Sequence, residues 1–188
     1  EIAGGSEDMM AFENAKGNPV LMKMVNEIHE NKDYLGEIDG LIGDGDHGMN
    51  MNKGFMLFGT QYGDQEFTFT EGLYNLGNIL FSQIGGSMGP IYGTIFMDAA
   101  DAGTDLEEIT VKDLADMLSA GLSGLQEIVE AQVGDKTLVD TLSPAVDALK
   151  DAASSGTDFK EALENMKTAA RKGMESTGDL VAKYGRSS

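Results

Sequence analysis

Several residue types are missing or scarce in this chain of 188 residues, which has no cysteine, no tryptophan and only three prolines. Without cysteine there is no disulfide framework, no thiolate zinc site and no cysteine nucleophile, and a reducing cytoplasm is the compartment that we predict. No apolar run approaches the roughly 20 residues that cross a bilayer. Residues 1–5 also lack the basic and apolar stretches of a secretory signal. The sequence therefore predicts a protein that is neither secreted nor inserted in a membrane.

Basic residues are scarce as well. The chain has 13 lysines and arginines against 32 acidic residues, which gives a formal net charge of -19. Because such a charge repels a phosphate backbone, nucleic-acid binding is disfavoured. The same field raises the local concentration of divalent cations near any cluster of carboxylates. The length suffices for one domain with one core, so we expect a single fold with a single site.

Helix signals recur along the chain, and no alternating five-residue strand is found. Each expected start has a polar residue before apolar side chains at helical spacing. We therefore expect an all-α domain over residues 18–188, preceded by a poorly structured extension over residues 1–17. The expected helix starts lie at Asn18-Pro19, with an end near Tyr34, at Thr70, at Thr110 with Asp113 in a capping box, at Ser143-Pro144 and at Thr157.

The most informative stretch is Asp39-Gly40-Leu41-Ile42-Gly43-Asp44-Gly45-Asp46-His47-Gly48-Met49-Asn50, in which three acids lie within eight residues. The glycines between them permit tight turns that bring the carboxylates together. Oxygen ligands of this kind suit Mg²⁺ or Ca²⁺, not zinc. An EF-hand is excluded, because Gly48 and Phe55 stand where that motif needs ligands. The sequence thus favours a Mg²⁺ site in which substrate phosphates complete the coordination.

The residues alone leave open the role of the aspartates and the role of His47. The aspartates could instead cap the following helix, because acids are common at helix starts. His47 could donate a hydrogen bond to a phosphate, orient an aspartate or accept a phosphoryl group, and the first two roles are preferred over the third. The cluster alone does not decide between these interpretations.

Three further polar stretches stand at expected helix boundaries. In Ile84-Gly85-Gly86-Ser87-Met88-Gly89, small residues let backbone N–H groups approach a phosphate, although a plain turn explains them equally well. It is not a P-loop, because no Gly-Lys-Ser/Thr occurs there. Gly134-Asp135-Lys136-Thr137-Leu138-Val139-Asp140 offers a cation and a hydroxyl to a phosphate. Lys183-Tyr184-Gly185-Arg186-Ser187 offers an arginine that could reach the phosphates of a nucleotide or stack on its base. Either could equally be an ordinary helix end.

Taken together and in this order, the stretches at 39–55, 85–94, 134–137 and 185–186 resemble those of the DhaL family, the nucleotide-binding subunits of dihydroxyacetone kinases. The resemblance spans roughly residues 19–188, and the Asp-x4-Asp-x-Asp-His-Gly block is its most specific part. It implies an up-and-down antiparallel barrel of about eight amphipathic helices. Relatives continue with an Asp-Pro-Gly turn and a final helix that nothing in this sequence matches, so either the last helix is missing here or the barrel is closed differently.

The resemblance also implies the ligands and the residues that contact them. Two Mg²⁺ ions held by Asp39, Asp44 and Asp46 would bridge the phosphates of ADP or ATP. Where some relatives have Ala-Ser after the paired glycines, this chain has Ser87-Met88, which leaves open which side chain makes the contact. The nucleotide would be lined by His47, Gly48, Met49, Asn50, Gly85, Gly86, Ser87, Met88, Thr137 and Arg186.

By the same resemblance, a separate DhaK-type subunit would hold dihydroxyacetone or a related keto sugar. This chain would present the nucleotide phosphate to it, a role that needs no nucleophile or base of its own. Exchangeable ATP and a bound ADP that a phosphotransferase-system protein rephosphorylates are both open as donors, as is a homodimer. A non-catalytic Mg-nucleotide sensor acting through protein partners is the alternative function, and a Ca²⁺-stabilised helical bundle is a further alternative.

Overall fold

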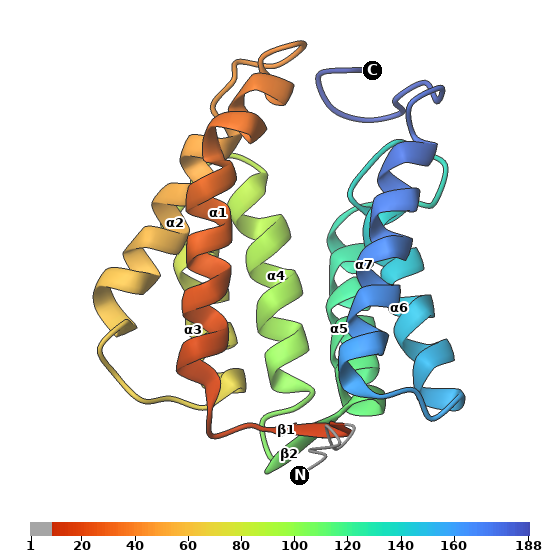
Figure 1. The fold of residues 1–188 in the computed structure, drawn as a ribbon. Helices are drawn as coiled ribbons and strands as arrows, with labels where there is room; N and C mark the ends of the chain where they lie inside the picture. Colours follow the sequence, from red (N-terminus) through yellow and green to blue (C-terminus); the bar gives the residue numbers. More distant parts are fainter. Residues whose placement is uncertain (1–8) are drawn as a thin grey trace, which may run out of the picture.

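A computed structural model describes residues 9–188, and residues 1–8 lie outside the described part. Seven helices that run alternately up and down dominate this part (Figure 1). The expected all-α class is confirmed, with seven of the about eight expected helices in residues 9–188. The elements are β1 (Ala11–Glu13), α1 (Gly17–Asp39), α2 (His47–Tyr62), α3 (Phe69–Gln83), α4 (Met88–Asp101), β2 (Glu108–Thr110), α5 (Val111–Ile128), α6 (Val139–Ser154) and α7 (Phe159–Ser176).

Each helix packs against the next one along the chain, and α1 also packs against α3. Because the helices alternate in direction, the loops after α1, α3 and α5 meet at one end of the molecule together with the C-terminal residues (Figure 1). We call this the loop end. The two short strands lie at the opposite end, which we call the strand end. All polar stretches singled out in the sequence therefore fall at the loop end.

The main core lies between the helices, with Phe58, Leu21, Leu76 and Leu80 fully buried. A smaller buried cluster of Ile95, Leu125, Ala131 and Val139 joins α4, α5 and the start of α6. Two glycines bring α3 and α4 close together, since a Cβ on Gly93 would lie 2.7 Å from the carbonyl oxygen of Gly77. The final glycine of the 85–94 stretch is thus explained by helix packing.

The first helix differs from its expected bounds at both ends. It begins at Gly17, and the side chain of Asn18 donates to the carbonyl oxygens of Gly63 (2.9 Å) and Gln65 (2.7 Å) instead of capping the helix. It ends at Asp39, beyond the expected end near Tyr34. The longer helix carries Asp39 to the loop end, which matters for the site described below.

The other helix starts test local capping signals. The capping box at Thr110 and Asp113 is confirmed, because each partner accepts a hydrogen bond from the backbone of the other. The remaining starts were predicted at the wrong residues. For α3 and α7 a neighbouring polar side chain provides the cap, whereas α6 begins without a cap from its N-cap residue Leu138. Thr68 rather than Thr70 caps α3, Asp158 rather than Thr157 caps α7, and Pro144 lies inside α6, which begins at Val139.

The expectation of a poorly structured extension over residues 1–17 is wrong for residues 9–17, whereas residues 1–8 lie outside the described part. β1 pairs antiparallel with β2, with Phe12 opposite Ile109. Asn14 is 2% exposed, and its side chain donates to the Thr70 hydroxyl (3.1 Å) and the Leu106 carbonyl (2.7 Å). Strands of three residues are too short for an alternating pattern, which is why the sequence did not predict them.

None of the helices in residues 9–188 has the length and hydropathy of a membrane span.

Candidate functional site

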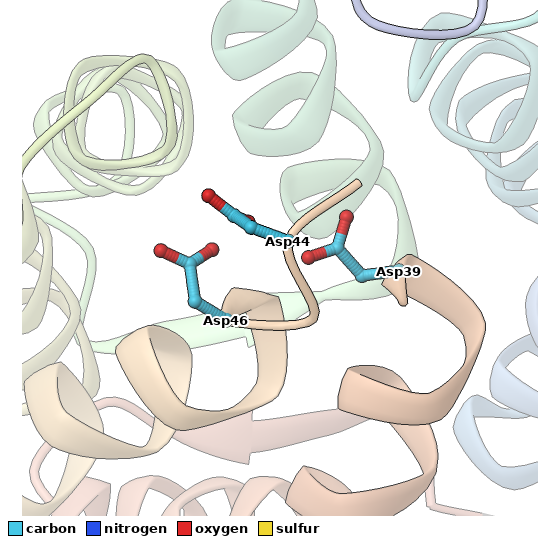
Figure 2. A group of neighbouring side chains, drawn as sticks. All are labelled: Asp39, Asp44 and Asp46. Atoms are coloured by element: carbon cyan, nitrogen blue, oxygen red, sulfur yellow. The ribbon is translucent and has the colours of Figure 1, made fainter. Parts of the chain in front are cut away.

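The loop between α1 and α2 brings the three predicted metal ligands together. Asp39 is the last residue of α1, Asp44 lies in the loop, and Asp46 immediately precedes α2. One oxygen of each carboxylate lies within 4.8 Å of the others, and Figure 2 shows the three groups beside one another. Gly45 has a φ of 75°, a left-handed conformation that favours glycine. This turn allows Asp44 and Asp46 to approach one another.

Helix capping, the alternative role of these aspartates, applies only to Asp39. Its Oδ2 accepts a hydrogen bond from the backbone N–H of His47 at 3.3 Å. Asp46 stands at the N-cap position of α2 but makes no side-chain cap hydrogen bond. Because Asp44 and Asp46 are exposed and have no capping role, capping does not explain the cluster.

Two glycines of the acidic stretch are explained by packing. A Cβ on Gly43 would collide with the Asp39 carboxylate, and a Cβ on Gly48 would collide with the Lys32 carbonyl oxygen. Gly48 is therefore buried between α1 and α2, in contrast to the exposed Met49 that follows it. Of the four residues expected to line a nucleotide in the first turn of α2, Gly48 has the least open surface.

Arg186 reaches the acidic loop from the C-terminal segment, residues 177–188. Its Nη1 lies 2.7 Å from Oδ1 of Asp44. The hydrogen bond from Arg186 is the main cause that lowers the pKa of the Asp44 carboxyl from 3.8 to about 2. The resemblance placed Arg186 in the nucleotide pocket, and the structure places it on one of the predicted metal ligands.

The glycine turn before α4 is open to its surroundings. Gly85, Gly86 and Ser87 are exposed, and a Cβ added to either glycine would meet no atom within 4 Å. Gly86 has a φ of 71°, which again favours glycine. Met88 is half-buried and packs against the core. Of the Ser87-Met88 pair, Ser87 therefore has the more exposed side chain.

The loop between α5 and α6 is organised by Asp140, which is 3% exposed. Its carboxylate accepts hydrogen bonds from the backbone N–H groups of Gly134 (2.6 Å) and Thr137 (2.8 Å). Lys136 donates to the carbonyl oxygens of Thr177 (3.0 Å) and Leu180 (3.2 Å), so it fastens the C-terminal segment. Sequence reasoning gave Asp140 no role. The three-residue spacing of Thr137 and Asp140 is nevertheless the same as that of Thr110 and Asp113, which was recognised as a capping box.

The N-cap residues of the three helices that begin at the loop end, α2, α4 and α6, make no side-chain cap hydrogen bond. The first N–H of α2 is bound by Asp39 instead, and that of α6 by the Thr137 hydroxyl at 3.2 Å, so α4 is the start that no side chain of residues 9–188 caps. Of the four that begin at the strand end, α3, α5 and α7 are capped by Thr68, Thr110 and Asp158. An uncapped start leaves backbone N–H groups for another acceptor and carries the positive end of the helix dipole. The loop end therefore combines carboxylates for a cation with helix starts suited to an anion.

Two cavities adjoin this end of the barrel. One of about 470 Å³ lies between the end of α5 and the C-terminal segment, where Lys183 and Tyr184 line it. The other, of about 340 Å³, lies beneath His47, whose ring centroid is 6.2 Å from that of Tyr92. Burial raises the pKa of the Tyr92 hydroxyl. The second cavity is mostly apolar and is lined by Met24, Glu27, Ile28, Leu35, His47, Met51, Phe55, Tyr92 and Phe96.

The geometry agrees with comparisons to known proteins. A family model described as the DAK2 domain matches residues 41–188. The chain belongs to the DAK2 domain family. This DAK2 chain is 35% identical over 159 residues to the PEP-dependent dihydroxyacetone kinase, ADP-binding subunit DhaL, of Escherichia coli, covering 83% of this chain and 75% of that one. The resemblance drawn from the sequence motifs is thereby confirmed.

Two further relatives have related names. The DAK2 chain is 33% identical over 181 residues to the PEP-dependent dihydroxyacetone kinase 2, ADP-binding subunit DhaL, of Listeria innocua, covering 94% of this chain and 83% of that one. It is 35% identical over 173 residues to the PTS-dependent dihydroxyacetone kinase, ADP-binding subunit DhaL, of Lactococcus lactis, covering 89% and 80%. These matches span most of each relative.

The fold of the DAK2 chain is similar to that in the crystal structure of the dihydroxyacetone kinase of C. freundii, with a TM-score of 0.72 and 20% sequence identity. The match covers 94% of this chain and 31% of that chain. At this identity the likeness shows the fold alone, and it supports the helical architecture expected from the resemblance.

Proposed function

We propose that this chain is the nucleotide-binding subunit of a dihydroxyacetone kinase. It holds a magnesium-bound adenine nucleotide at the loop end and presents a phosphate to a keto sugar held by a DhaK-type subunit. The observation that carries the proposal is the meeting of three carboxylates, with oxygens within 4.8 Å of one another, at the same end as the uncapped start of α4. The printed names of the relatives, which are ADP-binding kinase subunits, support the same conclusion.

Asp39, Asp44 and Asp46 form the metal-binding part of the proposed site. All three offer carboxylate oxygens, which are the ligands that magnesium prefers, and no nitrogen or sulfur ligand belongs to the group. The net charge of -19 also attracts divalent cations to this exposed loop. We assign two ions, because magnesium usually takes only one or two protein carboxylates. When bound, magnesium neutralises negative charge on the nucleotide phosphates.

The phosphate-binding part combines the turn before α4 with Arg186. Gly85 and Gly86 offer exposed backbone, Ser87 adds a hydroxyl, and the uncapped start of α4 favours an anion. Fixed N–H donors of this kind stabilise charge on phosphate oxygens as a phosphoryl group leaves, without rearrangement during the reaction. Further proposed contacts come from His47, Gly48 (through its backbone), Met49, Asn50, Met88 and Thr137.

The names of the relatives indicate which phosphoryl donor to expect. The subunits from E. coli and L. lactis are named PEP-dependent and PTS-dependent. We propose the same arrangement for this chain, in which ADP stays bound and a phosphotransferase-system protein rephosphorylates it. The cavity of about 470 Å³ that Lys183 and Tyr184 line offers room for the nucleoside at the loop end.

Exposed apolar side chains beside the acidic loop support docking of a second subunit. Leu41 is 82% exposed, Ile42 is 63% exposed and Met49 is 71% exposed. Large apolar side chains that are exposed to this degree are common at protein interfaces. We assign this surface, Leu41, Ile42 and Met49, to the DhaK-type subunit, because the acceptor hydroxyl must come within bonding distance of a phosphate held beside it. We call it the apolar rim.

Reconstitution of the reaction tests the proposal. The chain is mixed with a DhaK-type subunit and dihydroxyacetone, and triose phosphate is measured with either phosphotransferase-system proteins and phosphoenolpyruvate or ATP as the donor. We expect product with the first donor system and none when Asp44→Asn replaces the wild type. A chain that binds Mg-ADP but phosphorylates none of several keto sugars with either donor would refute the kinase function and favour a nucleotide sensor.

A further inference from the structure

Arg186 lies in the C-terminal segment that follows α7, and it contacts Asp44 in the loop between α1 and α2. The C-terminal segment leaves α7 and passes over the loop end (Figure 1). Lys136 holds it by bonds to the carbonyl oxygens of Thr177 and Leu180, and the backbone N–H of Lys183 donates to the Asp135 carbonyl at 3.2 Å. The segment is thus fastened to the α5–α6 loop, and Arg186 extends from it to Asp44 on the opposite loop.

The three carboxylates of the acidic loop differ in their partners. Asp39 accepts the N–H of His47 at 3.3 Å, while Asp44 alone among the three forms a salt bridge within residues 9–188, at 2.7 Å. The Arg186 side chain in this pair is 62% exposed and that of Asp44 is 51% exposed. Exposed ion pairs contribute little to stability and are screened by solvent. The pair can therefore orient Asp44 and still be broken by a competing cation.

Arg186 and a divalent ion compete for the Asp44 carboxylate. Asp44 Oδ1 receives the guanidinium now, yet the same carboxylate is needed by a divalent ion, and a guanidinium bound to it blocks part of the approach. A guanidinium also binds phosphate oxygens in the same forked geometry that it offers to carboxylates. The position of Arg186 therefore suits two successive contacts rather than one permanent contact.

We propose that Arg186 and the metal ion exchange places at Asp44. Before the ion binds, the guanidinium occupies the position of a cation beside the acidic loop and lowers the repulsion between its carboxylates. When the ion takes Asp44, Arg186 is released and donates to the nucleotide phosphates instead. The second contact rests on the proposed function, whereas the exchange itself concerns only Arg186, Asp44 and the ion. Arg186 is thus a positioning residue that couples metal binding to nucleotide binding.

The exchange predicts effects of opposite sign for one substitution. In Arg186→Ala the competitor for Asp44 is gone, so Mn²⁺ in the absence of nucleotide should bind about twofold to fivefold more tightly, the range expected when an exposed ion pair no longer has to be broken. Mg-ADP should bind about tenfold more weakly, because a charged donor to the phosphates is lost. A residue that merely supported the fold would weaken both.

Lys183→Ala is the matched control for the metal-only measurement. It removes the same charge three residues earlier in the same segment, where Lys183 faces Asp135 at 3.6 Å and not the acidic loop. Any general effect of a more negative surface on Mn²⁺ binding appears equally in this variant. The excess tightening in Arg186→Ala over Lys183→Ala is the quantity that reports the exchange.

Electron paramagnetic resonance of Mn²⁺ without nucleotide, followed by calorimetry with Mg-ADP, carries out the test on the full chain. Tighter Mn²⁺ binding by Arg186→Ala than by Lys183→Ala, with weaker Mg-ADP binding, supports the exchange. Equal or weaker Mn²⁺ binding by Arg186→Ala, or no metal binding by any variant without nucleotide, overturns it. Neither result affects the proposed function, which fails instead if the wild type binds no ADP in the presence of Mg²⁺.

Discussion

The two ends of the helical barrel differ in how their helix starts are held. At the strand end, Thr68, Thr110 and Asp158 cap three helices with their side chains, and Asn14 is buried in hydrogen bonds. At the loop end, the N-cap residues of α2, α4 and α6 make no cap hydrogen bond, and only single N–H groups of α2 and α6 are bound by Asp39 and Thr137. A cap satisfies backbone N–H groups and stabilises the helix, while an uncapped start leaves them to a ligand. We infer that the strand end stabilises the fold, whereas the loop end binds the ligand.

Substitutions at the loop end should therefore alter binding with little effect on stability, and substitutions at the strand end should do the reverse. The largest effect is expected for Asp46→Asn, because Asp46 has no capping hydrogen bond and its carboxylate is exposed beside the other two. Loss of a metal ligand should weaken Mg-ADP binding by about 100-fold or more. Calorimetry measures the affinity and circular dichroism the helix content, and a large loss of helix would contradict the separation.

Docking of the partner subunit gives a second test of the binding role of the loop end. Leu41→Asp combined with Ile42→Asp places charges in the apolar rim without removing a predicted metal ligand. We expect the complex with the DhaK-type subunit to weaken by at least about tenfold, since desolvation of a charge at an interface is unfavourable. Mg-ADP affinity of the isolated chain should stay within about twofold. Unchanged association, measured by analytical ultracentrifugation, would remove the apolar rim from the interface.

Asn14→Ala tests the strand end. Its amide donates to Thr70 and to the Leu106 carbonyl, and its oxygen accepts from the Thr70 backbone N–H at 3.1 Å. Removing these partners leaves buried polar groups unpaired, so the free energy of unfolding should fall by about 2 kcal/mol. Urea denaturation measures this change. Calorimetry on the same variant should show unaltered Mg-ADP affinity, and a coupled loss of affinity would show that the two ends are not independent.

The smallest expected effect comes from a matched pair of hydroxyl deletions at two helix starts. Thr110→Ala removes a confirmed capping box and should lower the free energy of unfolding by about 1 kcal/mol. Ser87→Ala removes a hydroxyl at an N-cap position that makes no cap hydrogen bond, and should change stability by less than about 0.5 kcal/mol. Thermal denaturation of both variants side by side makes the comparison. Equal losses would mean that Ser87 caps α4 after all.

Much of the fold could be predicted from the sequence, because apolar spacing and the capping box at Thr110 are local signals. The helix starts at Thr68 and Asp158 were missed by one or two residues, since several polar side chains near each start can serve as a cap. The pairing of β1 with β2 was missed for another reason. It joins residues almost 100 positions apart, and three-residue strands leave no periodic pattern.

In the candidate site, too, contacts between residues close in the sequence were predicted, whereas a contact between distant residues was not. The meeting of Asp39, Asp44 and Asp46 was expected from glycines between neighbouring residues, and the structure brings them within 4.8 Å. The contact between Arg186 and Asp44 was not expected, because it depends on how Lys136 and Asp140 hold the α5–α6 loop and the C-terminal segment. Such contacts are set by packing of distant segments, which no spacing in the sequence encodes.

The number of metal ions bound with ADP tests whether Asp39, Asp44 and Asp46 hold the metal ions of the nucleotide. Electron paramagnetic resonance with Mn²⁺ in place of Mg²⁺ counts the ions on the wild type and on a variant with Asp39→Asn, Asp44→Asn and Asp46→Asn combined. We expect two ions on the wild type in the presence of ADP and none bound at this site in the variant. Equal metal binding by the two proteins would contradict the assignment of the acidic loop as the site that holds the nucleotide.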